Sequence, residues 1–135
     1  MSRSGYSDDC EGSELNLWRG AVNKAINGKR GQAFLHEALA ALDAMPDKKL
    51  AAESLHETAS GEYCTLGVVG LARGMDMQPL EDSSSDQVAK AFGIAHALAA
   101  EIIFANDDGL FYSVTPEKRW SYMRGWIASN IQRQP

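Results

Sequence analysis

Apolar side chains recur at the three- and four-residue spacing of an α-helix in three long segments of this chain. Each segment meets a strong boundary signal: the first stops at Gly28, the second stops at Pro46, and the third starts at Thr115 and Pro116. Glycine readily ends a helix, proline cannot continue one, and threonine followed by proline is typical of a first turn. The pattern therefore predicts a mainly α fold.

We expect about six helices. They are predicted at residues 13–27, from after Gly31 to 45, and at 66–73, 86–92, 95–106 and 116–131. The spacing of Ser84 and Gln87 predicts a capping box at the start of the fourth helix. The short connection between the first two helices predicts an antiparallel helical hairpin. Glycines at positions 67 and 70 predict that the third helix packs closely against another element.

The helical spacing breaks near residues 50–65, where two short segments flank Gly61. We predict one small β-hairpin there. Residues 1–12 are rich in Ser, Gly, Asp and Glu and predict an irregular N-terminal arm, and residues 110–114 form either a strand or a tucked segment. A length of 135 residues fits one domain. The expected organisation is this arm followed by a single compact helical domain over residues 13–135.

Charge is distributed unevenly along the chain. The formal net charge is −5, but residues 38–115 carry twelve acidic and four basic side chains, a net charge of −8. Residues 116–135 carry +3. An acidic surface favours docking on a basic surface of another protein, including one that normally holds nucleic acid. The alternative is ordinary solubilising charge.

A basic segment precedes this acidic region. Between residues 15 and 36 the chain holds four cations and no acid: Arg19, Lys24, Lys29 and Arg30. Two of them lie between Gly28 and Gly31, which predicts a flexible turn whose N–H groups and cations bind an anion or a partner. A solvated turn without a ligand is the alternative. The spacing does not match a nucleotide-binding phosphate loop.

Residues 86–105 carry the spacing of a helix-turn-helix, with Ala89 in the first helix and Gly93 at the turn. Its candidate contact residues are Lys90, His96 and Glu101. A recognition helix normally presents Arg, Lys, Asn or Gln to base edges, and Glu101 would repel phosphate. The alternative is a pair of packed helices that does not touch DNA.

Three tryptophans fall on apolar helical stripes: Trp18, Trp120 and Trp126. They are either core residues or aromatic anchors for a partner. No two histidines and no cysteine pair have metal-ligand spacing, so the sequence predicts no catalytic residues, no metal and no cofactor. Cys10 and Cys64 are expected to be free thiols. An enzyme that uses a cysteine or a metal is the alternative.

Targeting signals are not evident. Residues 1–20 contain no apolar run, and no stretch reaches the roughly 20 apolar residues that span a bilayer. We therefore expect a cytoplasmic protein without a membrane segment.

Three strings together carry a resemblance to a known family: SGYSDDC at residues 4–10, LWRGAV at 17–22 and GKRGQAFL at 28–35. ALDAMP at 41–46 and FGIA at 92–95 add to it. The chain resembles small proteins encoded by bacteriophages and prophages of proteobacteria. The family has no assigned activity, so the resemblance transfers no site residue. It implies an accessory protein in the bacterial cytoplasm.

This context favours a non-enzymatic protein, monomeric or homodimeric, that binds a host or phage protein, such as an inhibitor of a host process or defence complex. A DNA-binding regulator that uses residues 86–105 is the second hypothesis.

Overall fold

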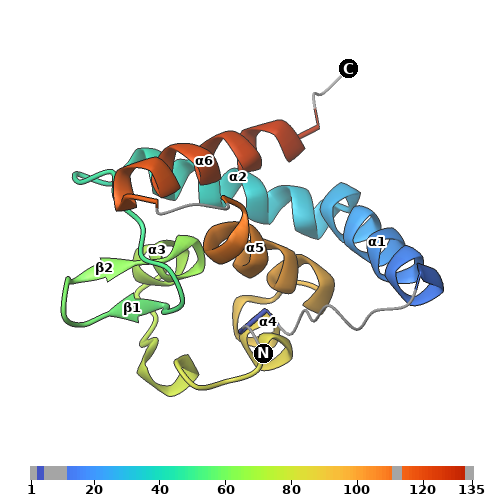
Figure 1. The fold of residues 1–135 in the computed structure, drawn as a ribbon, viewed down its shortest axis with the longest axis horizontal. Helices are drawn as coiled ribbons and strands as arrows, with labels where there is room; N and C mark the ends of the chain where they lie inside the picture. Colours follow the sequence, from blue (N-terminus) through green and yellow to red (C-terminus); the bar gives the residue numbers. More distant parts are fainter. Residues whose placement is uncertain (1–2, 5–11, 111–113, 133–135) are drawn as a thin grey trace.

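In a computed structural model the chain is mainly helical, as predicted. The structure describes residues 3–4, 12–110 and 114–132 of the 135. These contain six α-helices, one 3₁₀ helix and one β-hairpin (Figure 1). The elements are α1 (Gly12–Asn27), α2 (Lys29–Asp43), β1 (His56–Glu57), β2 (Glu62–Tyr63), α3 (Thr65–Ala72), η1 (Gln78–Leu80), α4 (Ser85–Phe92), α5 (His96–Asp108) and α6 (Pro116–Asn130).

Helix α5 is the centre of the fold. It contacts α1, α3, α4 and α6, and Figure 1 shows it between these elements. Apolar or small residues occur around most of its circumference, and its Leu98 and Ile102 are fully buried. A helix that is apolar on all sides must be covered on all sides. Helices α1, α3, α4 and α6 therefore pack around α5.

Helices α2 and α6 lie side by side above this centre (Figure 1). Two long-range hydrogen bonds join them: Trp120 Nε1 donates to the Leu42 carbonyl (3.2 Å), and Gln32 Nε2 donates to the Asn130 carbonyl (3.0 Å). Thr115 caps α6 by accepting from the Lys118 N–H. The predicted start of the last helix is confirmed.

The predicted antiparallel pairing of the first two helices is wrong. Only Gly28 separates α1 from α2, and Figure 1 shows the two helices extending away from this junction. Gly28 lies in extended backbone (φ −74°, ψ 162°); its N–H donates to the Lys24 carbonyl and its carbonyl accepts from the Gln32 N–H. One residue thus ends the first helix and starts the second, which leaves too little chain for a reversal.

The hairpin is confirmed but short. His56 pairs with Tyr63 and Glu57 pairs with Glu62, in antiparallel register. The residues from Thr65 onward begin α3 instead of extending the second strand. Cys64 is the N-cap of this helix, and its Sγ accepts from the Gly67 N–H.

Local signals set the remaining boundaries. Ser84 and Gln87 form the predicted capping box, and Gly93 ends α4 with φ 74°. The first helix begins at Gly12, one residue before the expected cap at Ser13. Most of the predicted N-terminal arm and residues 111–113 lie outside the described residues.

Within the described part of the chain, no single helix is long and apolar enough to cross a membrane. Helices α4 and α5 reach that length and composition only when taken together across a bend of 110°.

Candidate functional site

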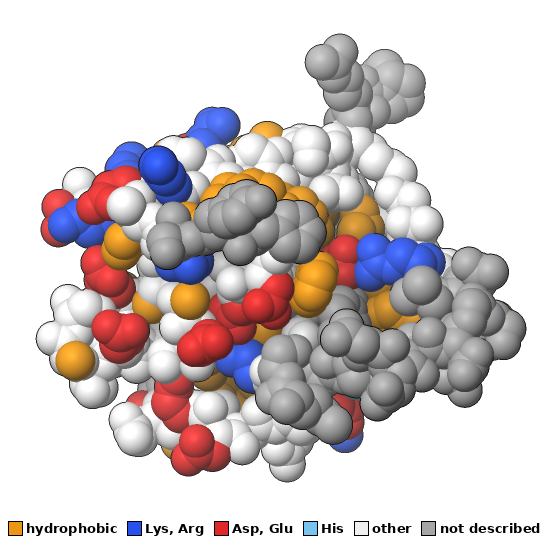
Figure 2. Space-filling view, in the orientation of Figure 1, with side chains coloured by type: hydrophobic (Ala, Val, Ile, Leu, Met, Phe, Trp, Pro, Cys, Tyr) orange, Lys and Arg blue, Asp and Glu red, His pale blue; other side chains and the backbone are white. Residues whose placement is uncertain are grey.

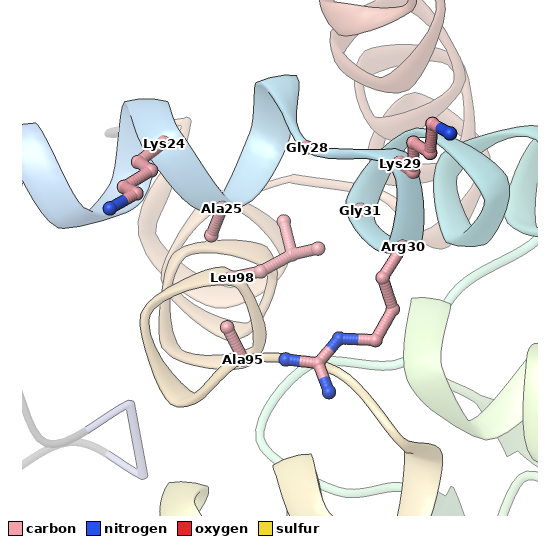
Figure 3. Close-up of a pocket in the computed structure, with 8 residues that line it drawn as sticks. All are labelled: Lys24, Ala25, Gly28, Lys29, Arg30, Gly31, Ala95 and Leu98. Atoms are coloured by element: carbon pink, nitrogen blue, oxygen red, sulfur yellow. The ribbon is translucent and has the colours of Figure 1, made fainter.

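The predicted basic turn lies at a cavity of about 230 Å³ between the α1–α2 junction and the start of α5. Lys24, Lys29 and Arg30 line it, together with Ala25, Gly28, Gly31, Ala95 and Leu98 (Figure 3). The expectation of a flexible turn is wrong, because Lys29, Arg30 and Gly31 form the first turn of α2. Gly31 is required there, since a Cβ at this position would collide with the Ala25 carbonyl oxygen.

The three cations are arranged differently around the cavity. The guanidinium of Arg30 reaches across to Ala95, whereas the amino groups of Lys24 and Lys29 point away from the opening (Figure 3). All three residues are exposed, and none has an ion-pair partner among the described residues. The cavity therefore has one cation directed into it and two at its rim.

Arg19, the fourth predicted member, does not line this cavity. Its Nη1 donates to Glu101 Oε2 at 3.0 Å and its Nη2 donates to Oε1, a bidentate ion pair between α1 and α5. Arg19 is thus removed from the candidate anion site. Glu101, predicted as a candidate DNA-contact residue, is half of the same pair.

The predicted helix-turn-helix is a pair of helices joined by a glycine turn and bent by 110°. The bend lies in the range of the DNA-binding motif, about 90–120°. However, eight residues of α5 are buried: Ala97, Leu98, Ala99, Ala100, Ile102, Ile103, Ala105 and Asn106. A recognition helix needs an exposed face for the major groove. The burial of this helix favours the alternative prediction, a pair of packed helices that does not touch DNA.

The other two candidate residues of this motif have local partners. His96 begins α5; its Nε2 lies 2.7 Å from Ser85 Oγ, and its ring and that of Trp18 form a T-shaped pair with a centroid distance of 5.5 Å. Lys90 is exposed and pairs with Asp86, one turn earlier on α4. These contacts join neighbouring turns and helices.

The three tryptophans are half-buried and pack against the hydrophobic core. Trp18 contacts His96, and Trp120 lies under the amino group of Lys48 at 5.4 Å from the ring centroid. This packing favours the core interpretation over the partner-anchor interpretation for all three, Trp126 included.

No group of three His, Cys, Asp or Glu side chains suited to a metal occurs among residues 3–4, 12–110 and 114–132. Cys64 is a free thiol and is buried, whereas Cys10 lies outside these ranges. The ring of His56 stacks on Tyr63 at 4.2 Å, and His36 is exposed on α2. Whether the protein has catalytic activity stays a prediction.

An acidic surface forms around the hairpin, which sequence reasoning located only as a long acidic segment. We define the hairpin acidic surface as Glu53, Glu57, Glu62 and Glu81. The Glu81 carboxylate accepts from the N–H groups of Leu55 (2.8 Å) and His56 (3.3 Å), which ties η1 to the first strand. Figure 2 shows acidic side chains gathered on the side of the molecule that holds β1 and β2.

Asp107, at the end of α5, anchors the edge of this surface. Its carboxylate accepts from Arg3 at 2.6 and 2.8 Å and from the Glu53 N–H at 2.9 Å. Burial lowers the pKa of Arg3, but the neighbouring Cys64 and Asp107 outweigh this effect, so the pKa is raised overall. Asp107 is therefore neutralised by a structural ion pair, while Glu53, in the left-handed region at φ 65°, is exposed.

No protein-family model, curated protein or solved structure matches this chain. The resemblance to bacteriophage and prophage proteins stays a prediction.

Proposed function

We propose that this chain is a non-enzymatic accessory protein of a bacteriophage or prophage, and that it binds a host or phage protein in the bacterial cytoplasm. The hairpin acidic surface is the docking site, and the partner presents a basic surface. No cofactor takes part.

The observation that carries this proposal is the pairing of Glu57 with Glu62 directly across the hairpin. Like charges at opposed positions of an antiparallel pair destabilise it, by roughly 0.2–1 kcal/mol relative to neutral pairs. The other cross-strand pair, His56 with Tyr63, is a ring stack and holds the hairpin together beside these two acids. An arrangement that is unfavourable for folding supports a role in binding.

Charge and rigidity support the same role. Glu53, Glu57, Glu62 and Glu81 have no ion-pair partner among the described residues, so their negative charge is not neutralised within the fold. The hydrogen bonds that the Glu81 and Asp107 carboxylates accept from backbone N–H groups hold the surrounding backbone in one arrangement. A preorganised charged surface raises the association rate with a partner of opposite charge and sets the orientation of docking.

The test is capture of a partner from host lysate with wild-type protein and two charge-reversal variants. Glu62→Lys reverses a charge within the hairpin acidic surface, and Asp47→Lys makes the same change at an exposed acid outside it. We expect the wild type and Asp47→Lys to retain one basic protein in a salt-sensitive manner, and Glu62→Lys to lose it. Equal retention by both variants contradicts the proposal.

The second candidate function is DNA binding through residues 86–105, favoured only by the 110° bend at the glycine turn. It predicts retention on DNA at low salt that is lost with Lys90→Glu or His96→Glu. The absence of DNA binding at low salt, together with capture of a protein, excludes this candidate.

A further inference from the structure

We propose that two copies of this chain form a homodimer by exchanging α1, so that each α1 covers α5 of the other copy. Helix α1 lies at one edge of the molecule and packs mainly against α5 and α2 (Figure 1). A single residue, Gly28, connects α1 to α2. Short connections between packed elements invite such an exchange, because the same contacts form between two copies once the connection straightens. The hairpin acidic surface lies at the opposite edge and takes no part (Figure 1).

The backbone of Gly28 is already close to that of a helix. Its φ of −74° lies in the helical range, and only its ψ of 162° differs from the helical value of about −42°. Its N–H donates to the Lys24 carbonyl at 3.1 Å and its carbonyl accepts from the Gln32 N–H at 2.9 Å, which are the two bonds that it forms inside an α-helix. A rotation about one bond of Gly28 therefore joins α1 and α2 into a continuous helix from Gly12 to Asp43.

Gly31 makes the bent form sterically demanding. In this form a Cβ at position 31 would collide with the Ala25 carbonyl oxygen. In a continuous helix the same two residues are six positions apart, which separates them by about 9 Å along the axis. A side chain at position 31 then makes no such contact. The bent form therefore requires glycine at this position, whereas the continuous helix does not.

The start of α2 lacks the features that normally stabilise a helix start. Gly28 provides no side-chain cap, and the first turn contains no acid. The first turn instead carries Lys29 and Arg30, which the positive end of the helix dipole disfavours. The negative end of α1 favours only one cation, Lys24. A continuous helix has neither end at this point, so straightening removes two unfavourable charge–dipole interactions and one favourable one.

The inside of the bend is not filled by side chains. The cavity of about 230 Å³ lies there, between the α1–α2 junction on one wall and Ala95 and Leu98 of the facing segment on the other (Figure 3). Opening the bend therefore breaks few contacts at the junction itself. The main loss is the burial of Val22 and Ile26 on α1. Exchange restores this burial, because α1 then packs on the other copy in the same way.

Side-chain amides hold the bend in the monomer. Gln32 Nε2 donates to the Ile26 carbonyl at 2.8 Å, and in a continuous helix this carbonyl accepts from the N–H of residue 30 instead. The Gln132 N–H donates to Gln32 Oε1 at 2.8 Å, and Gln132 Nε2 donates to Asn27 Oδ1 at 2.9 Å. Both forms thus satisfy the Ile26 carbonyl. Rising protein concentration shifts the balance toward the exchanged dimer by mass action.

The first experiment is sedimentation equilibrium of the full chain over a concentration series. We expect the mass of the wild type to rise from 14.7 kDa toward twice that value. Gly31→Ala should lower the dimer dissociation constant by at least about tenfold, because exchange relieves the clash in both copies. Gly20→Ala makes the same substitution within α1, where a Cβ meets nothing within 4 Å, and should behave like the wild type.

Charge reversal across the α1–α5 contact distinguishes exchange from any other dimer and does not depend on the glycine variants. Arg19 on α1 pairs with Glu101 on α5 within one chain. Arg19→Glu and Glu101→Arg each place like charges together in the monomer and in their own exchanged homodimer. An exchanged heterodimer of the two variants has an attractive pair at both α1–α5 contacts.

The two charge variants are refolded together from urea, and native mass spectrometry measures the species that form. We expect heterodimer in excess over both homodimers, and we expect the double variant, with both changes in one chain, to behave like the wild type. The proposal is overturned if the wild-type mass stays at that of one chain throughout the series, if folded Gly31→Ala dimerises no more than Gly20→Ala, or if the mixture contains no excess of heterodimer.

Discussion

Asn106 Oδ1 accepts hydrogen bonds from both the N–H (3.0 Å) and the hydroxyl (2.8 Å) of Thr65, the first residue of α3. Its Nδ2 donates to the Ala51 carbonyl at 3.0 Å. Asn106 and Thr65 are buried polar residues, and this amide joins the central helix to α3 and to the segment before the hairpin. It is a buried polar link within a largely apolar core.

Asn106→Ala should destabilise the fold strongly, because it leaves buried groups of Thr65 and Ala51 without partners. Each unsatisfied buried group costs about 1–3 kcal/mol, so we expect a loss of at least about 2 kcal/mol in the free energy of unfolding. Urea denaturation measures it. Asn23→Ala, at an exposed position of α1, should stay within about 0.5 kcal/mol of wild type. Similar losses in the two variants would contradict a structural role for the amide.

Gly67→Ala and Gly125→Ala should have opposite effects on stability. A Cβ at position 67 would collide with the Leu55 carbonyl oxygen, whereas a Cβ at position 125, in the middle of α6, meets nothing within 4 Å. Replacing an exposed helical glycine with alanine stabilises by about 0.5–1 kcal/mol. Thermal unfolding should show a lower melting temperature for Gly67→Ala and a higher one for Gly125→Ala. The same sign in both would contradict the close packing of α3.

Acid should weaken the contact between α2 and α3. Arg73 donates two hydrogen bonds to Glu37 (2.8 and 2.7 Å), and this contact holds the pKa of Glu37 below its ordinary value of 4.5. A carboxyl whose pKa is lowered by folding stabilises the fold above its unfolded pKa and loses this effect as the pH falls through the folded pKa. The free energy of unfolding should therefore decrease as the pH is lowered below 4.5.

Glu37→Gln should remove this part of the pH dependence in urea titrations at several pH values. The carboxylate is partly exposed, so the loss at neutral pH should be no more than about 1 kcal/mol. Arg73→Lys keeps the charge but not the two-point contact and should give an intermediate slope. An unchanged slope in Glu37→Gln would exclude this pair as a source of acid sensitivity.

Glu62→Lys should stabilise the isolated protein while it abolishes partner binding. The change replaces a like-charge cross-strand pair with an opposite-charge pair, which is worth roughly 0.2–1 kcal/mol. Thermal unfolding in low salt measures the gain, and added salt should reduce it. Glu62→Gln serves as the neutral control. A stability loss in the lysine variant would show that the hairpin tolerates its paired acids for structural reasons.

Local signals explain which parts of the fold could be predicted. The cap at Thr115 and the capping box at Ser84 depend on residues three positions apart, so the sequence alone located these helix starts within one residue. The direction of α2 after Gly28 could not be predicted this way, because it depends on the packing of α2 against distant helices.

The same limit applies to the candidate sites: residues close in sequence could be grouped, whereas partners distant in sequence could not. Lys24, Lys29 and Arg30 are close in sequence, and the structure keeps them around one cavity. Arg19 does not line this cavity, because its side chain pairs with Glu101, a residue 82 positions away in the sequence. The hairpin acidic surface was missed as a unit because it depends on Glu81 contacting the backbone of Leu55 and His56 across 26 and 25 positions. The spacing of residues along the sequence does not show which distant residues come into contact in the fold.

The packing of α6 on α2 has a consequence for how the protein is synthesised. Leu35, Ala38 and Leu42 are fully buried in the finished fold, and Trp120 on α6 donates to the Leu42 carbonyl. The ribosome makes α2 early and α6 last of the described helices. Until α6 emerges, the apolar stripe of α2 lacks part of its cover, so the nascent chain is the state most exposed to aggregation and to chaperones.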